Sequence, residues 1–391
     1  MPGSPPGEFM ELDAGGDPLA RSSIERLVER YGSPLFVIDT ARIRAQYRQL
    51  AGALPTVGLH YALKPLPHAA VVRALDEEGA CFDLATNGEI DLVRRSGIPA
   101  KRCIHTHPIK RDGDIRSALA YGIDLFVVDN ADELRKFVKF RNRASVLIRI
   151  AFRNADAVCD LSRKFGCAPG ALGELLALAA DLGINVRGLS FHVGSQAMDP
   201  GMHVQAIEVC RDLIDGRGQS LDILDIGGGF PIAYGQPAVP IDPYCAPIRR
   251  ALSRLPPGIR VIAEPGRYIA APAAVAVSSV MGRAQRDGRW WYYLDDGLYG
   301  SYSGQIYDHA KYPIDVPPSA GKVHPSVLAG PTCDSIDVID DALQLPLLEI
   351  GDLIIGREMG AYTWASGSEF NFFPRATVLA LEQGRVSTEE G

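Results

Sequence analysis

The chain has 391 residues, of which 47% are apolar and 22% charged, a composition that excludes a disordered or fibrous protein. Its 47 acidic and 40 basic residues give a net charge of −7 with no long basic block, so we expect no nucleic acid partner. No apolar run approaches the roughly 20 residues that cross a bilayer, and the N-terminus lacks a secretory signal. We therefore expect no membrane partner and a cytoplasmic location.

The N-terminal residues 1–17 are rich in proline and glycine without hydrophobic periodicity, so we expect a disordered leader. A helix is predicted over residues 24–31 and a strand over residues 35–39. The chain's cysteines are scattered and form no Cys-x-x-Cys pair, which predicts neither a disulfide framework nor a zinc site. They are Cys81, Cys103, Cys159, Cys167, Cys210, Cys245 and Cys333.

The central part of the chain repeats one pattern, in which a short apolar run is followed by a segment with helical periodicity. Strands are expected at residues 59–63, 81–85, 103–106, 124–128, 146–151, 186–192, 221–226 and 260–263. Helices are expected between them, among others at residues 69–78, 88–96, 131–140, 173–182 and 203–215.

Eight strand–helix units in roughly 230 residues are typical of a (β/α)₈ barrel. We therefore predict an α/β fold with a TIM barrel over residues 40–272. A doubly wound sheet is the alternative, because periodicity alone cannot close a barrel. Such a sheet usually carries a glycine fingerprint after its first strand, where this chain has Lys64 and Pro65.

After the barrel, the sequence pattern changes to strands without regular helices. A hairpin is predicted from residues 274–284 and 289–294, which flank an Arg-Asp-Gly turn. Because residues 35–39 precede the barrel strands, we expect them to join this second sheet. Further strands are expected at residues 326–328, 353–355 and 376–381, in a β domain formed by residues 18–39 and 273–391.

The residues that follow the barrel strands are unusually polar, and in such barrels the loops at these ends carry the chemistry. Gly227-Gly228-Gly229 and Glu264-Pro265-Gly266-Arg267 follow the last two strands, and bare amides with an arginine suit a phosphate. A triple glycine also serves loop geometry alone. Lys64 follows the first strand, where burying an ammonium is costly, although by itself it is compatible with a surface lysine. A lysine and a phosphate site in one barrel mouth together indicate pyridoxal phosphate.

Ten segments between residues 34 and 381 resemble, in the family's order, the fold-type III pyridoxal-phosphate-dependent decarboxylases, above all the eukaryotic-type ornithine and lysine decarboxylases. The segments are HYALKPLP, CFDLATNGE, HPIKRDGDI, DAVCDLSRKFG, FHVGSQ, DIGGGFP, EPGRYIAAP, DDGLYGSYSGQIYDH, GPTCDSIDVID and MGAYTWASGSEFN. This resemblance implies an alanine-racemase-like barrel followed by a β domain, pyridoxal 5'-phosphate as cofactor, no metal, and a homodimer with shared active sites.

The resemblance also implies roles for single residues. Lys64 matches the lysine that bonds covalently to the cofactor, Glu264 the carboxylate that pairs with the pyridinium nitrogen, and His192 the imidazole stacked on the ring. Asp83 and Arg149 match residues that lie beside the cofactor. The phosphate is expected among Ser195, Gly227, Gly228, Gly229, Gly266, Arg267 and Tyr362, while Glu89 and Lys164 resemble structural or interface positions.

At the substrate end, Asp308 and Asp334 match the two acids that hold the distal ammonium of ornithine, with Asp334 coming from the partner subunit. Two carboxylates favour a cation and repel a distal carboxylate. Cys333 resembles the acid that returns a proton to Cα after decarboxylation and completes the catalytic set of Lys64, His192 and Glu264. Tyr299 and Tyr307 are also expected at the substrate.

We favour decarboxylation of a cationic L-amino acid, ornithine or lysine, to a diamine, as in polyamine biosynthesis. Diaminopimelate, arginine or a carboxylated intermediate of a siderophore or other specialised pathway stay open as substrates, and so does a catalytically dead regulatory homologue. Gly304 replaces a bulkier family residue and is expected to leave room for a longer amine. A metal site of His105 and His107 with Asp295 and Asp296 is not expected.

Overall fold

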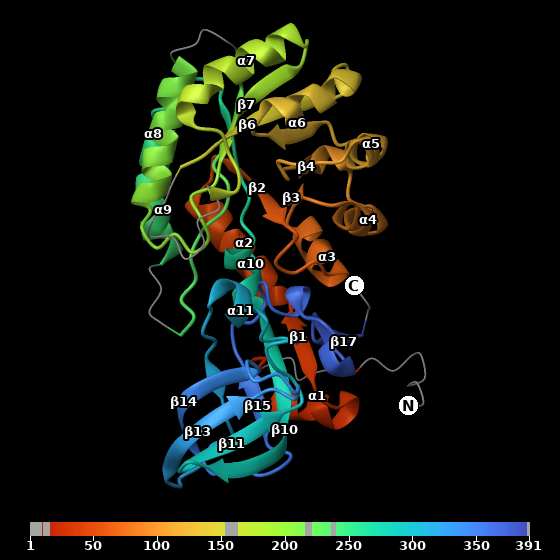
Figure 1. Cartoon of the computed structure of the whole chain (residues 1–391), viewed down its shortest axis with the longest axis vertical. Coiled ribbons are helices and arrows are strands. Elements are labelled where there is room, and N and C mark those ends of the chain that lie inside the picture. Colours follow the sequence, from red (N-terminus) through yellow and green to blue (C-terminus); the bar gives the residue numbers. More distant parts are fainter. Residues whose placement is uncertain (1–9, 11–15, 153–162, 216–220, 236–239, 389–391) are drawn as a thin grey trace. The chain divides into compact units, whose positions relative to one another are not determined.

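The computed structural model describes residue 10 and residues 16–152, 163–215, 221–235 and 240–388 (Figure 1). Cys159 and most of the predicted leader lie outside these residues. The chain divides into two compact units, one of Ala45–Ile269 and one of Met1–Arg44 with Ala270–Gly391. Within the described residues, no helix is long and apolar enough to span a membrane.

The first unit is a closed barrel of eight parallel strands, as predicted. Each strand pairs with the next, and the last pairs with the first through Val57 and Val261, which excludes the doubly wound sheet. The barrel strands are β2 (Val57–Ala62), β3 (Cys81–Leu84), β4 (Cys103–His105), β5 (Leu125–Val128), β6 (Ser145–Ile150), β7 (Asn185–Phe191), β8 (Ile223–Asp225) and β9 (Arg260–Ala263).

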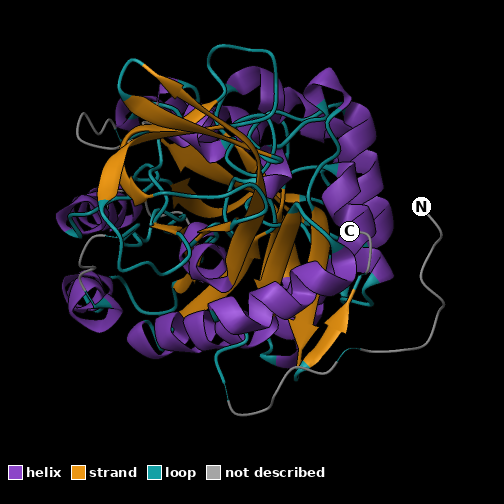
Figure 2. Ribbon diagram, turned by 90° about the horizontal axis from the view of Figure 1, so that it is seen from below, coloured by secondary structure: helices purple, strands orange, loops and turns teal. Residues whose placement is uncertain are grey.

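The barrel strands are short apolar runs because their two faces are covered, one by the barrel interior and one by helices. Branched side chains from five strands form one buried cluster of Ile104, Leu125, Val127, Leu147, Ile223 and Ile262. The helices lie outside the strands (Figures 1 and 2). They are α2 (Thr40–Ala53), α3 (Ala69–Glu77), α4 (Asn87–Arg95), α5 (Asp112–Tyr121), α6 (Ala131–Lys136), α7 (Leu172–Asp181), α8 (Gly201–Asp215), α9 (Ile241–Leu252) and α10 (Arg267–Ala270).

The second unit is a nine-stranded sheet whose main path is β14-β13-β11-β10-β1-β16-β17. The predicted hairpin is present, because β10 pairs antiparallel with β11. The early strand β1 pairs antiparallel with β10 and parallel with β16. The elements are α1 (Arg21–Tyr31), β1 (Leu35–Asp39), β10 (Ala274–Arg286), β11 (Arg289–Leu294), α11 (Gly304–Asp308), β12 (Ile314–Asp315), β13 (Val323–Ala329), β14 (Val338–Pro346), β15 (Leu353–Gly356), β16 (Thr377–Glu382) and β17 (Arg385–Ser387).

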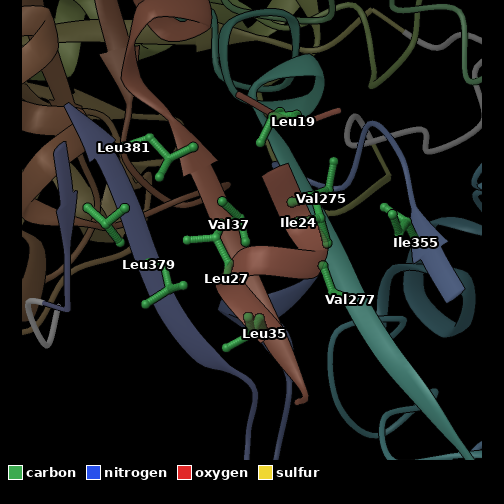
Figure 3. Close-up of a cluster of buried hydrophobic side chains, with 11 residues drawn as sticks. Leu19, Ile24, Leu27, Leu35, Val37, Val275, Val277, Ile355, Leu379 and Leu381 are labelled. Carbon is green, nitrogen blue, oxygen red and sulfur yellow. The ribbon is translucent and has the colours of Figure 1, made fainter. Parts of the chain in front are cut away.

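Helix α1 covers one face of this sheet and forms a core with it (Figure 3). Ile24 and Leu27 of α1 are fully buried against the strands. Burying each such side chain is worth about 1.5–3 kcal/mol. The sheet partners are Leu35 and Val37 of β1, Val275 and Val277 of β10, Ile355 of β15, and Leu379 and Leu381 of β16.

Candidate active site

Lys64 and Asp83 form an ion pair at the end of the first two barrel strands. The Lys64 Nζ lies 3.9 Å from Asp83 Oδ2, and the lysine side chain is 45% exposed while the aspartate is 3% exposed. Thr106 Oγ1 donates a hydrogen bond to Asp83 Oδ1. Burial, followed by the charge of Glu264, raises the pKa of Asp83 to about 7, although Lys64 opposes the shift. A half-exposed amine thus lies beside a carboxyl that titrates near neutral pH.

Asp225 and Glu264 form a pair of buried carboxyls at the ends of β8 and β9. Burial, followed by the charge of Asp225 and a hydrogen bond with it, raises the pKa of Glu264 well above its usual value. Burial raises the pKa of Asp225 to about 6. The Asp225 Oδ1 also accepts the Gly227 N–H at 2.9 Å. Glu264 therefore carries the proton of the pair, which suits a group that shares a proton with an aromatic nitrogen.

Arg149 interacts electrostatically with both carboxyls, and His192 interacts with Arg149. Burial lowers the pKa of Arg149, and Glu264 and Asp225 oppose this shift. Burial and then the charge of Arg149 lower the pKa of His192 well below its usual value, so its ring is neutral. The His192 Nδ1 accepts the Gly194 N–H at 3.0 Å, which fixes the ring orientation. A neutral, oriented imidazole is suited to stacking on a flat ring.

The three glycines after β8 are required by close backbone approach. Gly227 has φ +65°, and a Cβ there would lie 2.3 Å from the Phe191 carbonyl oxygen. A Cβ on Gly228 would lie 2.7 Å from the Glu264 carbonyl oxygen and 3.2 Å from His192 Nε2. The glycine loop is therefore packed directly against both His192 and Glu264, in the same barrel mouth.

Arg267 completes a set of hydrogen-bond donors beside the glycine loop. Its Nε and Nη2 donate to Ser195 Oγ at 3.2 and 3.1 Å, and its Nη1 donates to the Tyr234 hydroxyl at 2.6 Å. A guanidinium with two hydroxyls is the donor chemistry that binds phosphate. A Cβ on Gly266 would lie 2.6 Å from Pro65 Cγ, so this glycine lets the Arg267 loop pack against the Lys64 loop. The barrel mouth thus fits pyridoxal 5'-phosphate, with an amine, a proton-bearing carboxyl and phosphate donors.

The substrate-end residues of the sequence prediction lie in the second unit. The Tyr299 hydroxyl donates to Asp334 Oδ2 at 2.5 Å, and this bond lowers the pKa of Asp334 and raises that of Tyr299 to about 12. Asp334 is therefore ionised. The Cys333 N–H donates to Asn371 Oδ1 at 3.1 Å, and the cysteine is exposed.

Tyr307, Asp308 and Tyr362 are also in the second unit. Tyr307 is 63% exposed on α11, which ends at Asp308. Tyr362 adopts a left-handed conformation with φ +57°.

The expectation that Gly304 leaves room for a longer substrate is wrong. A Cβ on Gly304 would lie 2.0 Å from the Tyr312 hydroxyl oxygen and 2.8 Å from the Tyr362 carbonyl oxygen. The space of the missing side chain is therefore filled by the protein itself. Gly304 is needed for packing α11 against Tyr312 and does not enlarge a pocket.

His105 and His107 make contacts of their own, although burial, then Lys110 and more weakly Lys64, lower the pKa of His107. The His105 ring packs against Phe126, with centroids 5.7 Å apart, and His107 Nδ1 accepts the Ile109 N–H. Among the described residues, no group of three His, Cys, Asp or Glu side chains is arranged to hold a metal. Glu89 belongs to a capping box with Thr86 at the start of α4, and Lys164 lies 5.1 Å from the Phe165 ring centroid.

The sequence interpretation missed Asp225, Thr106 and Tyr234. Asp225 directly precedes the glycines, so its place at a strand end was a usable signal. Thr106 and Tyr234 carry hydroxyls in loops, and their partners Asp83 and Arg267 are distant in sequence. Nothing in the chain's local pattern indicates those pairings.

Comparisons with known proteins match nearly the whole chain. A family model described as pyridoxal-dependent decarboxylase, pyridoxal binding domain, matches residues 40–271. The crystal structure of lysine/ornithine decarboxylase from Vibrio vulnificus, complexed with putrescine, is 53% identical with a TM-score of 0.89, and the match covers 93% of this chain and 99% of the other. The same Vibrio decarboxylase has been solved with cadaverine.

Two further relatives are more distant. The lysine/ornithine decarboxylase of Selenomonas ruminantium is 35% identical over 368 residues, which are 93% of each chain. The arginine decarboxylase of Paramecium bursaria Chlorella virus, solved with agmatine, is 28% identical with a TM-score of 0.87, and the match covers 92% of this chain and 99% of the other.

Proposed function

Because this chain belongs to the pyridoxal-dependent decarboxylases, we propose that it converts ornithine or lysine to the corresponding diamine and CO₂. The family resemblance of the sequence is confirmed, and pyridoxal phosphate is the cofactor. The substrate choice is supported by the Vibrio relative, whose structures contain putrescine and cadaverine. The observation that carries the chemistry is the Lys64 amine beside Asp83, in the mouth that also holds Glu264 and the Arg267 donors.

When bound, pyridoxal phosphate supplies an aldehyde for the substrate's α-amino group and a ring that accepts the electron pair left on Cα as CO₂ departs. Lys64 would hold the cofactor through its Nζ. Glu264 would share its proton with the ring nitrogen, which would strengthen the electron-withdrawing character of the ring. His192 would lie against the ring, and Ser195, Arg267 and the glycine amides would hold the phosphate.

The substrate residues come from the second unit. Asp308 and Asp334 bind the distal ammonium, because paired carboxylates stabilise a cation and disfavour the distal carboxylate of diaminopimelate. The Cys333 thiol would give its proton to Cα after CO₂ has left, so that a C–H bond replaces the broken bond to the carboxyl carbon and the sulfur is left as a thiolate. We also propose a homodimer in which Cys333 and Asp334 serve the partner's site.

A substrate panel tests this function. Purified protein is incubated with ornithine, lysine, arginine or diaminopimelate, and both CO₂ and the amine product are identified. We expect kcat/KM for the better of ornithine and lysine to exceed that for arginine and diaminopimelate by at least about ten-fold. Ornithine and lysine differ by one methylene, which is worth about 1–3 kcal/mol, so their own values are expected to differ by no more than about 10–200-fold. CO₂ from diaminopimelate alone would reassign the substrate, and no CO₂ from any substrate would favour a regulatory homologue.

A matched pair of lysine variants controls the panel. Lys64→Ala is expected to abolish turnover, whereas Lys101→Ala, at an exposed position before β4, is expected to leave it unchanged. The dimer is tested by mixing Lys64→Ala chains, which cannot turn over, with Cys333→Ala chains, which release CO₂ without the normal yield of diamine, and by measuring the diamine formed. Random reassociation with shared sites would restore about a quarter of wild-type activity, whereas sites built from one chain would restore none.

A further inference from the structure

The carbonyls of the glycine loop after β8 are all held by donors of the barrel unit. The Gly227 oxygen accepts the Glu264 N–H at 2.8 Å, and the Gly229 oxygen accepts the Ala197 N–H at 2.9 Å. The Gly228 oxygen lies 3.0 Å from His203 Nε2. Two of these anchors are backbone groups, which the fold supplies whatever the side chain. The anchor of Gly228 is a side chain and therefore depends on the identity of residue 203.

Holding a carbonyl also sets the direction of the next amide. A trans peptide is planar, so its C=O and the following N–H point in opposite directions. The His203 bond to the Gly228 oxygen therefore fixes where the Gly229 N–H points. That N–H is one of the groups proposed to bind the phosphate.

The surroundings of His203 leave its ring one orientation and one protonation state. The residue is fully buried on α8, and burial lowers its pKa to about 4, so it is neutral. Because a carbonyl only accepts, the proton is on Nε2. The ring stacks on Phe230 with centroids 5.2 Å apart and planes at 22°.

The Tyr244 hydroxyl lies on the other side of the ring, 3.4 Å from His203 Nδ1, and donates to the Ala197 carbonyl at 2.7 Å. Ala197 in turn binds the Gly229 oxygen through its own N–H. The loop after β7, which carries Ser195, and the loop after β8 are thereby joined behind the phosphate donors.

We infer that His203 is a positioning residue for the cofactor, which holds the Gly228 carbonyl so that the Gly229 N–H is directed at the phosphate of pyridoxal 5'-phosphate. This inference rests on the proposed assignment of Gly227, Gly228 and Gly229 to the phosphate. His203 itself touches neither substrate nor cofactor in this role. Its effect is specific to the phosphate end and does not extend to the ring.

The test compares two ligands that differ only in the phosphate. Dissociation constants of the cofactor-free full chain are measured by titration with pyridoxal 5'-phosphate and with pyridoxal. His203→Phe keeps a ring that can stack on Phe230 but has no N–H. We expect this substitution to raise the dissociation constant of pyridoxal 5'-phosphate about ten-fold, which is the effect of one misdirected hydrogen bond to a charged group. The dissociation constant of pyridoxal should change by less than about two-fold.

The matched control is His60→Phe, which removes another buried imidazole whose Nδ1 lies 3.2 Å from a glycine carbonyl, that of Gly58. It is expected to leave the preference for the phosphorylated ligand unchanged. The ³¹P resonance of the bound phosphate gives a second readout and should move in His203→Phe alone. Equal weakening of both ligands, or no weakening, would overturn the inference.

Two amide variants decide the matter if His203→Phe does not fold. Gln places its amide N–H near the position of the imidazole Nε2, whereas Asn is one methylene shorter. We expect His203→Gln to retain the wild-type preference for pyridoxal 5'-phosphate over pyridoxal and His203→Asn to lose it. The same preference in both variants would overturn the inference.

Arg267→Met separates this inference from the assignment of the phosphate site. If the preference for pyridoxal 5'-phosphate over pyridoxal falls in Arg267→Met but not in His203→Phe, only the role of His203 is overturned. If this preference is unchanged in Arg267→Met, the phosphate site is overturned, and the role of His203 with it. Because no substrate is present, a wrong assignment of the decarboxylation substrate affects neither result.

Discussion

The pKa of Asp83 makes a specific prediction about stability. An aspartate that is 3% exposed and whose pKa rises from 3.8 to about 7 on folding keeps its proton in the folded state after the unfolded state has lost it. Stability therefore falls as pH rises from about 4 to about 7, and the loss is complete above that range. A rise of about 3 pKa units at 1.36 kcal/mol each gives a cost of about 4 kcal/mol above neutral pH.

Asp83→Asn removes this cost, because an amide does not titrate and its oxygen can still accept the Thr106 hydroxyl. Urea unfolding of cofactor-free protein should show that the variant is more stable than the wild type by about 4 kcal/mol at about pH 8, but by less than half of that at about pH 5. The exposed Asp212→Asn is the control and should show no such pH dependence. A gain of equal size at both pH values, or a loss at the higher pH, would refute the electrostatic reasoning.

Two substitutions test other parts of the site. Gly227→Ala places a Cβ 2.3 Å from the Phe191 oxygen at a left-handed φ, so cofactor affinity should fall by at least about ten-fold. Gly258 also has a positive φ, +92°, but open space around it, so Gly258→Ala should leave the affinity unchanged. Equal affinities in the two variants would contradict this reasoning. Cys333→Ala should still release CO₂ but lose the thiol proton donor, so gas and diamine yields should separate; a one-to-one diamine yield would assign the proton to another group.

Much of the barrel could be predicted because its strands are short apolar runs that can be recognised in the sequence. All eight predicted runs overlap the observed strands. Parallel strands covered on two faces are continuous apolar runs, and their short length and regular repeat distinguish them from buried helices. Helices α5 and α9 were expected from the strand–helix repeat but were given no bounds. Pro247 lies inside α9, and a proline normally ends a helical pattern, while α5 carries Gly113 in its first turn.

The barrel mouth was predictable only to the level of which residues follow which strand. Lys64, Asp83 and Glu264 were found from their positions, because strand ends of one barrel meet at one face. The partners that tune these residues were not found, since Asp225 affects Glu264 through space and His203 reaches Gly228 from a helix. The wrong expectation for Gly304 has the same cause, because a single sequence does not reveal that Tyr312 fills the vacated space.

The central claim is that the Lys64 nitrogen holds pyridoxal phosphate in the barrel mouth. Borohydride reduction of the holoprotein would make the bond between cofactor and lysine permanent, and digestion with mass spectrometry would locate it. The pyridoxyl group is predicted on Lys64, and Lys64→Ala should carry none. A label on a different lysine, or none in the wild-type protein, would contradict the account.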